Sequence, residues 1–251
     1  TEEVGLDRLN VMMFSLKMST MIPYILYLLV NQKDKNEIVN ICEYLEAYMM
    51  RRLICHVETR SYSKMYSDSL LTNSILALKD LQEFVNGKDS DRLTAPVDDA
   101  DIQKSINGGV YLINEQNMGI LYMLETRLRS DPYSATVMKG IKYYTLEHLM
   151  PKKWKQTWGF TGLDDATIQK RDDILYTLGN LAIIPGKLNT SISNSKWQDK
   201  LNGKGNKPGL IKAASGLITL DKYLKITDWD ENEITKRADD LYAQILSVWK
   251  K

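Results

Sequence analysis

Apolar and polar positions follow the period of an α-helix through the first half of the chain. Stripes of apolar residues three or four positions apart run from Ile38 to Leu53, from Leu70 to Val85 and from Ile113 to Leu128. This spacing places the apolar side chains of each stripe on one face, so three amphipathic helices are predicted. Asn86-Gly87 ends the middle stripe, because glycine favours a helix end. The N-terminal half is therefore expected to be helical.

The pattern changes near Asp131-Pro132, where we place a boundary between an α-helical domain (1–134) and a second domain (135–251). Aromatic and β-branched residues over 143–146 favour a short strand. A second apolar run over 181–184 predicts another short strand. Each run is followed within a few residues by a proline, which cannot continue a central strand.

The C-terminal region predicts helices. A helix is expected over Ser193–Leu201, while Leu217–Leu224 fits helix and strand equally. Asp230 is placed to cap a final helix, with Glu233 reaching back from the third position. The apolar residues of this helix share one face: Ile234, Ala238, Leu241, Ile245 and Val248.

Composition indicates a folded protein, because 43% of the 251 residues are hydrophobic. The net charge of +1 excludes no class of function. Basic residues nevertheless gather between His148 and Lys212, a segment with eleven basic and five acidic residues. A solvated surface and a nucleic-acid contact both remain open. Two cysteines make neither a disulfide framework nor a zinc site.

The N-terminus shows no signal peptide, and the apolar run Met21–Val30 contains Pro23 and is too short to cross a bilayer. We expect a soluble, cytoplasmic protein with no membrane partner. The chain opens without Met, so it is expected to be a piece of something longer.

The most informative residues are Glu147 and His148, followed downstream by Asn180 and Asn189. An imidazole titrates near neutrality and suits a general base, and an Asn side chain can orient its ring. Carboxylate and amide oxygens are hard ligands suited to Mg²⁺ or Mn²⁺. Neighbouring strand residues point to opposite faces, so Glu147 and His148 share a site only if the strand bends there.

Each of these residues also has an ordinary structural interpretation. Glu147 alone is a surface carboxylate, His148 a hydrogen-bonded structural histidine, Asn180 a turn residue and Asn189 a helix cap or loop residue. Their order and spacing together favour a site. The other histidine, His56, lacks such companions, and we interpret it as structural.

The motifs Glu147–Pro151, Gly179–Ile184 and Leu188-Asn189 resemble the HNH pattern of His-Me finger (ββα-metal) nucleases. More narrowly, they resemble the C-terminal HNH domain of GmrSD-type, modification-dependent restriction enzymes. The segments Tyr48–Cys55 and Ile120–Glu125 are also similar to that family. So is the closing pattern of Trp229, Ile234, Arg237, Leu241 and Trp249.

The resemblance implies a mainly α fold with a small ββα-metal unit, and Mg²⁺-dependent nicking or cleavage of DNA. His148 takes the base position, Asn180 the central position, and Glu147 and Asn189 the metal positions. HNH proteins often have Asp at the first metal position and His at the last, so both positions depart from the pattern here. Five residues are expected to contact DNA: Lys152, Lys153, Asn194, Lys196 and Lys200.

The resemblance also implies foreign or modified DNA as the partner and a separate upstream NTPase and sensor domain. A homo-oligomer stays open. Two other functions remain. One is a non-catalytic DNA-binding or regulatory module that keeps the nuclease shape, and the other is an all-helical interaction scaffold. The long interval between His148 and Asn180 carries Trp154 and Trp158, for which DNA contact and plain packing are both open.

Overall fold

The computed structural model describes residues 6–87, 94–109, 112–129, 138–159 and 161–251. It forms two compact units, one made of Thr1–Ile102 with Trp249–Lys251 and one made of Gln103–Val248. The division precedes the boundary expected near Asp131-Pro132, which lies outside the described residues. The cause is α6, which packs against the strands of the second unit.

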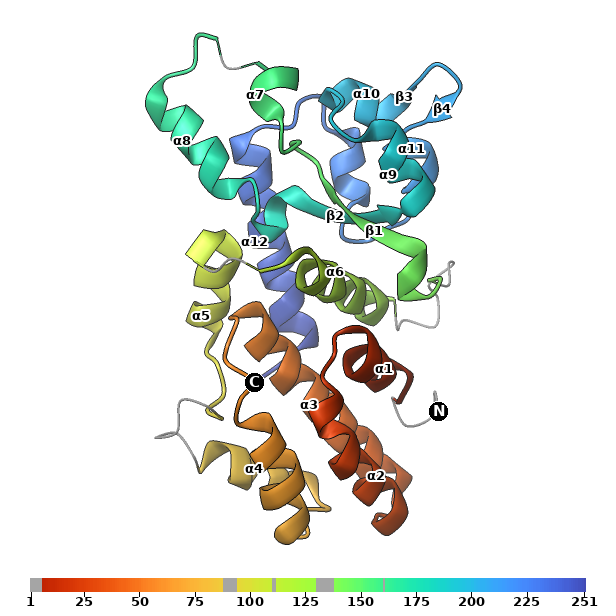
Figure 1. Ribbon diagram of the computed structural model, residues 1–251, viewed down its shortest axis with the longest axis vertical. Coiled ribbons are helices and arrows are strands. Elements are labelled where there is room, and N and C mark those ends of the chain that lie inside the picture. Colours follow the sequence, from red (N-terminus) through yellow and green to blue (C-terminus); the bar gives the residue numbers. More distant parts are fainter. Residues whose placement is uncertain (1–5, 88–93, 110–111, 130–137, 160) are drawn as a thin grey trace. The chain divides into compact units, whose positions relative to one another are not determined.

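The described part of the first unit is helical, as the periodicity predicted (Figure 1). Asp34 accepts a hydrogen bond from the Asn36 amide and so caps the longest helix, α3. The α-helices of this unit are α1 (Leu6–Asn10), α2 (Ile22–Asn31), α3 (Lys35–Ile54) and α4 (Leu78–Asn86), with α5 (Asp99–Lys104) at the boundary.

The stripe from Leu70 to Val85 is not one helix, which corrects the prediction. A π-helical segment ends at Leu70, Ser74 takes a positive φ of 53°, and α4 begins only at Leu78. Backbone groups at this break bond to side chains from elsewhere in the unit. Glu37 accepts a hydrogen bond from the Leu78 amide, and Gln32 donates one to the Leu76 carbonyl oxygen at 2.7 Å. These partners come from elsewhere in the unit, so periodicity alone could not reveal them.

The second unit combines short and long helices with two small antiparallel sheets (Figure 1). It is therefore not the all-helical scaffold that the sequence left open. Its strands are β1 (Tyr144–His148), β2 (Leu181–Pro185), β3 (Gly203–Lys204) and β4 (Lys207–Pro208). Its α-helices are α6 (Asn114–Leu128), α7 (Trp154–Thr157), α8 (Asp165–Ile174), α9 (Gly186–Ile192), α10 (Trp197–Asn202), α11 (Leu210–Ala213) and α12 (Glu231–Val248).

The β1–β2 ribbon forms the centre of this unit. Tyr144 pairs with Pro185 at one end, and His148 pairs with Leu181 at the other. The Tyr144 ring lies 6.0 Å from the Tyr122 ring of α6, whereas Thr145 accepts a hydrogen bond from α9. Because adjacent strand residues face opposite sides, α6 and α9 cover opposite faces of the ribbon. Helix α9 follows β2 directly in the chain, whereas α7 and α8 lie between the two strands.

Two helices of this unit differ from the sequence prediction. Instead of one helix over Ser193–Leu201, α9 and α10 are separated by a turn at 193–196. Asn189 consequently lies within a helix rather than a loop. At α12 the predicted cap is confirmed, because Asp230 Oδ1 accepts from the Asn232 and Glu233 amides at 2.8 and 3.0 Å. The Glu233 side chain pairs with Lys236 instead of reaching back.

Within the described ranges, no helix combines the length and the apolar character that crossing a bilayer would demand.

Candidate active site

His148 ends β1 and has a buried imidazole, with only 8% of the residue exposed. Its ring meets the Tyr176 ring edge-on at 5.6 Å, and the Lys152 ammonium lies 5.6 Å from the centre of that tyrosine ring. Among the described residues, the Nε2 atom of His148 is buried without a hydrogen-bond partner. Buried polar atoms are rarely left so, and an orphaned one needs an explanation such as a catalytic role or a bound water or ion.

The surroundings of His148 favour the neutral imidazole. Burial lowers its pKa to about 3, and the positive charges of Lys152 and Lys200 add to the effect. At neutral pH the ring therefore holds no charge, and one of its nitrogens is free to accept a proton.

Glu147 is buried beside His148 and forms an ion pair with Lys200 of α10. The Lys200 ammonium also donates to the His148 carbonyl oxygen at 2.7 Å, and Lys200 is fully buried. Burial raises the pKa of the Glu147 carboxyl, while the Lys200 ammonium opposes that rise. One cation thus fixes both the side chain of Glu147 and the backbone of His148.

This arrangement corrects the expectation that Lys200 touches DNA. A side chain with no exposed surface and two internal acceptors has no free donor at the protein surface. Of the two lysines expected to contact DNA here, Lys196 is exposed and Lys200 is buried.

Asn189 reaches the same strand from α9. Its Nδ2 donates to Thr145 Oγ1 at 3.1 Å and to the Leu146 carbonyl oxygen at 3.0 Å. Leu146 directly precedes Glu147, so Asn189 is anchored one residue away from the carboxylate. Because both bonds use the amide nitrogen, they leave the amide oxygen available as an acceptor or ligand.

Asn180 does not bond to the His148 ring as expected. Its Oδ1 accepts from the Met150 amide at 2.7 Å and from Trp229 Nε1 at 3.1 Å. Its Nδ2 donates to the carbonyl oxygens of Met150 and Leu175, both at 2.9 Å. Each end of the fully buried amide thus has two partners, so the side chain clamps the segment that follows His148 rather than the imidazole itself.

The helix α12 holds the segment around Asn180 in place. Arg237 is fully buried and donates to the carbonyl oxygens of Leu178, Gly179 and Leu181 at 3.1, 2.9 and 2.7 Å. Gly179 is required here, because a Cβ atom would lie 2.3 Å from the Ile234 carbonyl oxygen. The Gly-Asn-Leu motif therefore reflects close packing against α12.

The structure places the remaining predicted DNA-binding residues at the surface. Lys152, Lys153, Asn194 and Lys196 are all exposed. Only Lys152 has a described contact with the site, through Tyr176. Tyr176 itself was not identified from the sequence, since a single tyrosine after an apolar residue carries no motif.

The two tryptophans of the long interval have packing roles. Trp154 is 1% exposed and donates to Asp172 at 3.0 Å. Trp158 is half-buried and donates to the Ser195 carbonyl oxygen, also at 3.0 Å. Their indole N–H groups thus hold α7 to its neighbours.

The chain matches no curated protein. It does match a family model, described as the C-terminal domain of GmrSD restriction endonucleases, over residues 97–244. The match covers β1, β2, α9 and α10 and therefore every residue of the site. The chain belongs to the family of the GmrSD restriction endonuclease C-terminal domain.

Proposed function

We propose that the second unit is a metal-dependent HNH endonuclease that nicks or cleaves foreign or modified DNA. The observation that carries this proposal is the buried, unpartnered Nε2 of His148, which ends β1 directly after Glu147. Membership of a restriction endonuclease family supports it. NTP hydrolysis and modification sensing would belong to a separate upstream domain.

His148 would act as the general base. Its Nε2 takes a proton from water, the water oxygen attacks phosphorus, and the bond to the leaving oxygen breaks as that oxygen takes a proton from solvent. Burial keeps the imidazole neutral and so ready to accept the proton. The negative phosphodiester group raises the low pKa of His148 as it approaches, which strengthens the base at the moment of use.

The donor atoms present fit a hard cation that takes most of its ligands from water and phosphate. Glu147 offers a carboxylate and Asn189 an amide oxygen, and these two residues would hold Mg²⁺ or Mn²⁺. Within the described ranges, no group of three His, Cys, Asp or Glu side chains could form a complete protein cage. A bound cation would supply charge stabilisation on the phosphate and the leaving oxygen.

Supercoiled plasmid DNA tests the base assignment. In Mg²⁺ or Mn²⁺ we expect the parent chain to convert it to nicked or linear forms, and His148→Ala to lose that activity. His56→Asn is the matched control, because it removes the other histidine while asparagine tolerates the positive φ of 50° at that position. If His148→Ala cuts as fast as the parent, the assignment is wrong.

One observation favours a second candidate, a module that binds DNA without cutting it. The Glu147 carboxylate already has a cation partner in Lys200, which competes with a metal ion. Such a module would bind DNA in EDTA with strong salt dependence and leave plasmid intact with every divalent metal. The same plasmid experiment therefore separates the two candidates.

A further inference from the structure

A cavity of about 570 Å³ opens on the second unit, away from His148. It lies where the start of β1, the outer side of α9 and the β3–β4 hairpin meet. Its polar lining comes from Tyr143, Lys187, Thr190, Ser191, Asn206 and Lys207. None of its described lining residues is an Asp or a Glu, so its charge is entirely positive.

The two lysines of this cavity have their charges available. Lys187 and Lys207 are exposed, and neither ammonium has an ion pair or hydrogen bond with the described residues. The cavity beside α12 differs, because its lysines Lys222 and Lys236 are paired with Asp240 and Glu233. The groove can therefore bind an anion, whereas the charges of the cavity beside α12 are already neutralised.

The β3–β4 hairpin brings a third lysine, Lys204, beside the groove. Lys204 and Lys207 lie directly opposite each other across it. Like charges in that position repel, and a bound phosphate would relieve the repulsion. The hairpin is nonetheless closely fitted, because a Cβ at Gly203 would lie 2.1 Å from the Lys207 carbonyl oxygen. The repelling lysines are thus held together by the backbone.

An aromatic ring stands at the edge of the same groove. Tyr143 is 44% exposed, and its ring meets the buried Tyr144 ring edge-on at 5.2 Å. The Lys139 ammonium lies 4.2 Å from the centre of the Tyr143 ring. A fixed, exposed ring among lysines is the arrangement by which proteins stack an unpaired base while they contact its phosphates.

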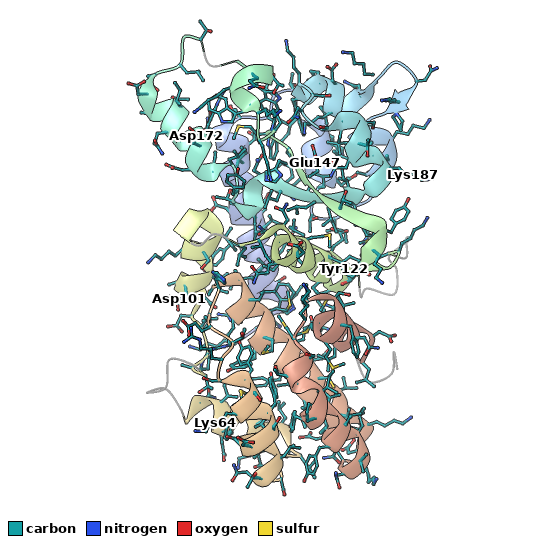
Figure 2. The ribbon with its side chains drawn as sticks, in the orientation of Figure 1. Lys64, Asp101, Tyr122, Glu147, Asp172 and Lys187 are labelled. Carbon is teal, nitrogen blue, oxygen red and sulfur yellow. The ribbon has the colours of Figure 1, made fainter. Side chains whose placement is uncertain are left out.

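A single DNA strand can contact both the groove and His148. Tyr143 immediately precedes β1, and His148 ends it, so the two lie about 16 Å apart at ~3.3 Å per residue. Helix α9 contributes to both sites, because its Asn189 bonds to β1 while its Lys187 lines the groove. Figure 2 shows Glu147 inside the unit and Lys187 at its edge.

We infer that this groove binds an unpaired stretch of DNA, with phosphates on Lys187, Lys207 and Lys204 and a base on Tyr143. The inference rests on the proposed nuclease function, which supplies the reason for DNA to lie nearby. The DNA affinity of the protein then comes from the lysines of the groove and not from the buried Lys200.

Fluorescence anisotropy with the whole chain in EDTA tests this. The probes are a labelled oligothymidylate and a duplex of the same length. For Lys187→Gln with Lys207→Gln, we expect weaker oligothymidylate binding and a log–log salt slope smaller by about 1.4, or ~0.7 for each lost phosphate contact. Lys222→Gln with Lys236→Gln removes the same charge from the paired lysines and should change neither quantity.

The tyrosine supplies the test for unpaired bases. Tyr143→Leu should weaken oligothymidylate binding about fivefold or more, and Tyr143→Phe should restore it. Duplex binding should change far less. An unchanged salt slope in the double lysine variant overturns the groove, and equal losses for duplex and oligothymidylate overturn the unpaired-strand assignment. Plasmid cutting by the parent is measured separately, so failure of the nuclease proposal is distinguishable.

Discussion

The ammonium nitrogen of Lys200 lies 2.7 Å from the backbone carbonyl oxygen of His148 and also pairs with the Glu147 carboxylate. Helix α10 is thereby tied to the end of β1 at the two residues on which the proposed chemistry depends. The tie is internal, with Lys200 and Glu147 side chains 0% and 7% exposed.

Removing the Lys200 charge should destabilise the protein. Lys200→Met leaves a buried carboxylate unpaired, which typically costs about 3–5 kcal/mol of unfolding free energy. Glu147→Gln combined with Lys200→Met removes both charges and should be more stable than the single variant. Urea unfolding measures both, and Lys196→Gln on the exposed side should stay within ~0.5 kcal/mol of the parent. A double variant less stable than Lys200→Met would contradict the pairing.

Loss of the Asn180 amide should also be costly. Asn180→Ala leaves buried groups of Met150, Leu175 and Trp229 without partners, and we expect a loss of at least ~3 kcal/mol. Trp229→Phe removes one of the four bonds and should cost about 1–2 kcal/mol. Thermal unfolding measures the loss of stability in each variant. Equal losses of stability would show that the Asn180 side chain does not act through its separate hydrogen bonds.

Gly179 should not accept even a methyl group. Gly179→Ala brings a Cβ to within 2.3 Å of the Ile234 carbonyl oxygen, and such overpacking typically costs about 1–3 kcal/mol or more. Gly140→Ala is the matched control, because its Cβ meets nothing within 4 Å and its φ is −56°. Guanidinium unfolding of both variants is the measurement, and comparable effects would refute the steric argument.

Stability should depend on pH through His148. Its folded pKa of about 3 lies below the ordinary value of 6.5, so the unfolded chain binds a proton that the folded chain does not. Stability due to this group is complete above pH 6.5 and falls as pH drops toward 3. By pH 5 the loss is about 2 kcal/mol. His148→Gln should lack this loss. Urea unfolding should therefore show that the free energy of unfolding falls more steeply on acidification in the parent than in the variant. Parallel pH profiles would exclude a buried neutral histidine.

Periodicity predicted the long helices because local spacing determines which face of a helix is apolar. Both short strands were likewise predicted, the first from aromatic and β-branched residues and the second from a short apolar run. The break before α4 was missed because the groups that satisfy its backbone come from Gln32 and Glu37. The start of α9 was missed because it follows Pro185 at a glycine, a signal that normally ends an element.

The candidate site shows the same limit. The sequence brought Glu147, His148, Asn180 and Asn189 forward by motif, but it could not show what each side chain touches. Lys200 was assigned to the surface because its partner Glu147 lies 53 residues away. The Asn180 clamp depends on Trp229, 49 residues beyond it. Arg237 was recognised only as part of a closing pattern, and its four carbonyl contacts explain why an arginine stands there.

Trp249 belongs to the first unit, and its indole N–H donates to Glu46 at 2.7 Å, although the whole second unit lies between Ile102 and Trp249 in the chain. During synthesis on the ribosome, the first 102 residues must therefore wait for Trp249. At roughly 5–20 residues per second the wait is on the order of ten seconds. Through that interval the buried position of Trp249 is empty, so the nascent N-terminal helices offer chaperones an exposed apolar surface until the second unit has been made.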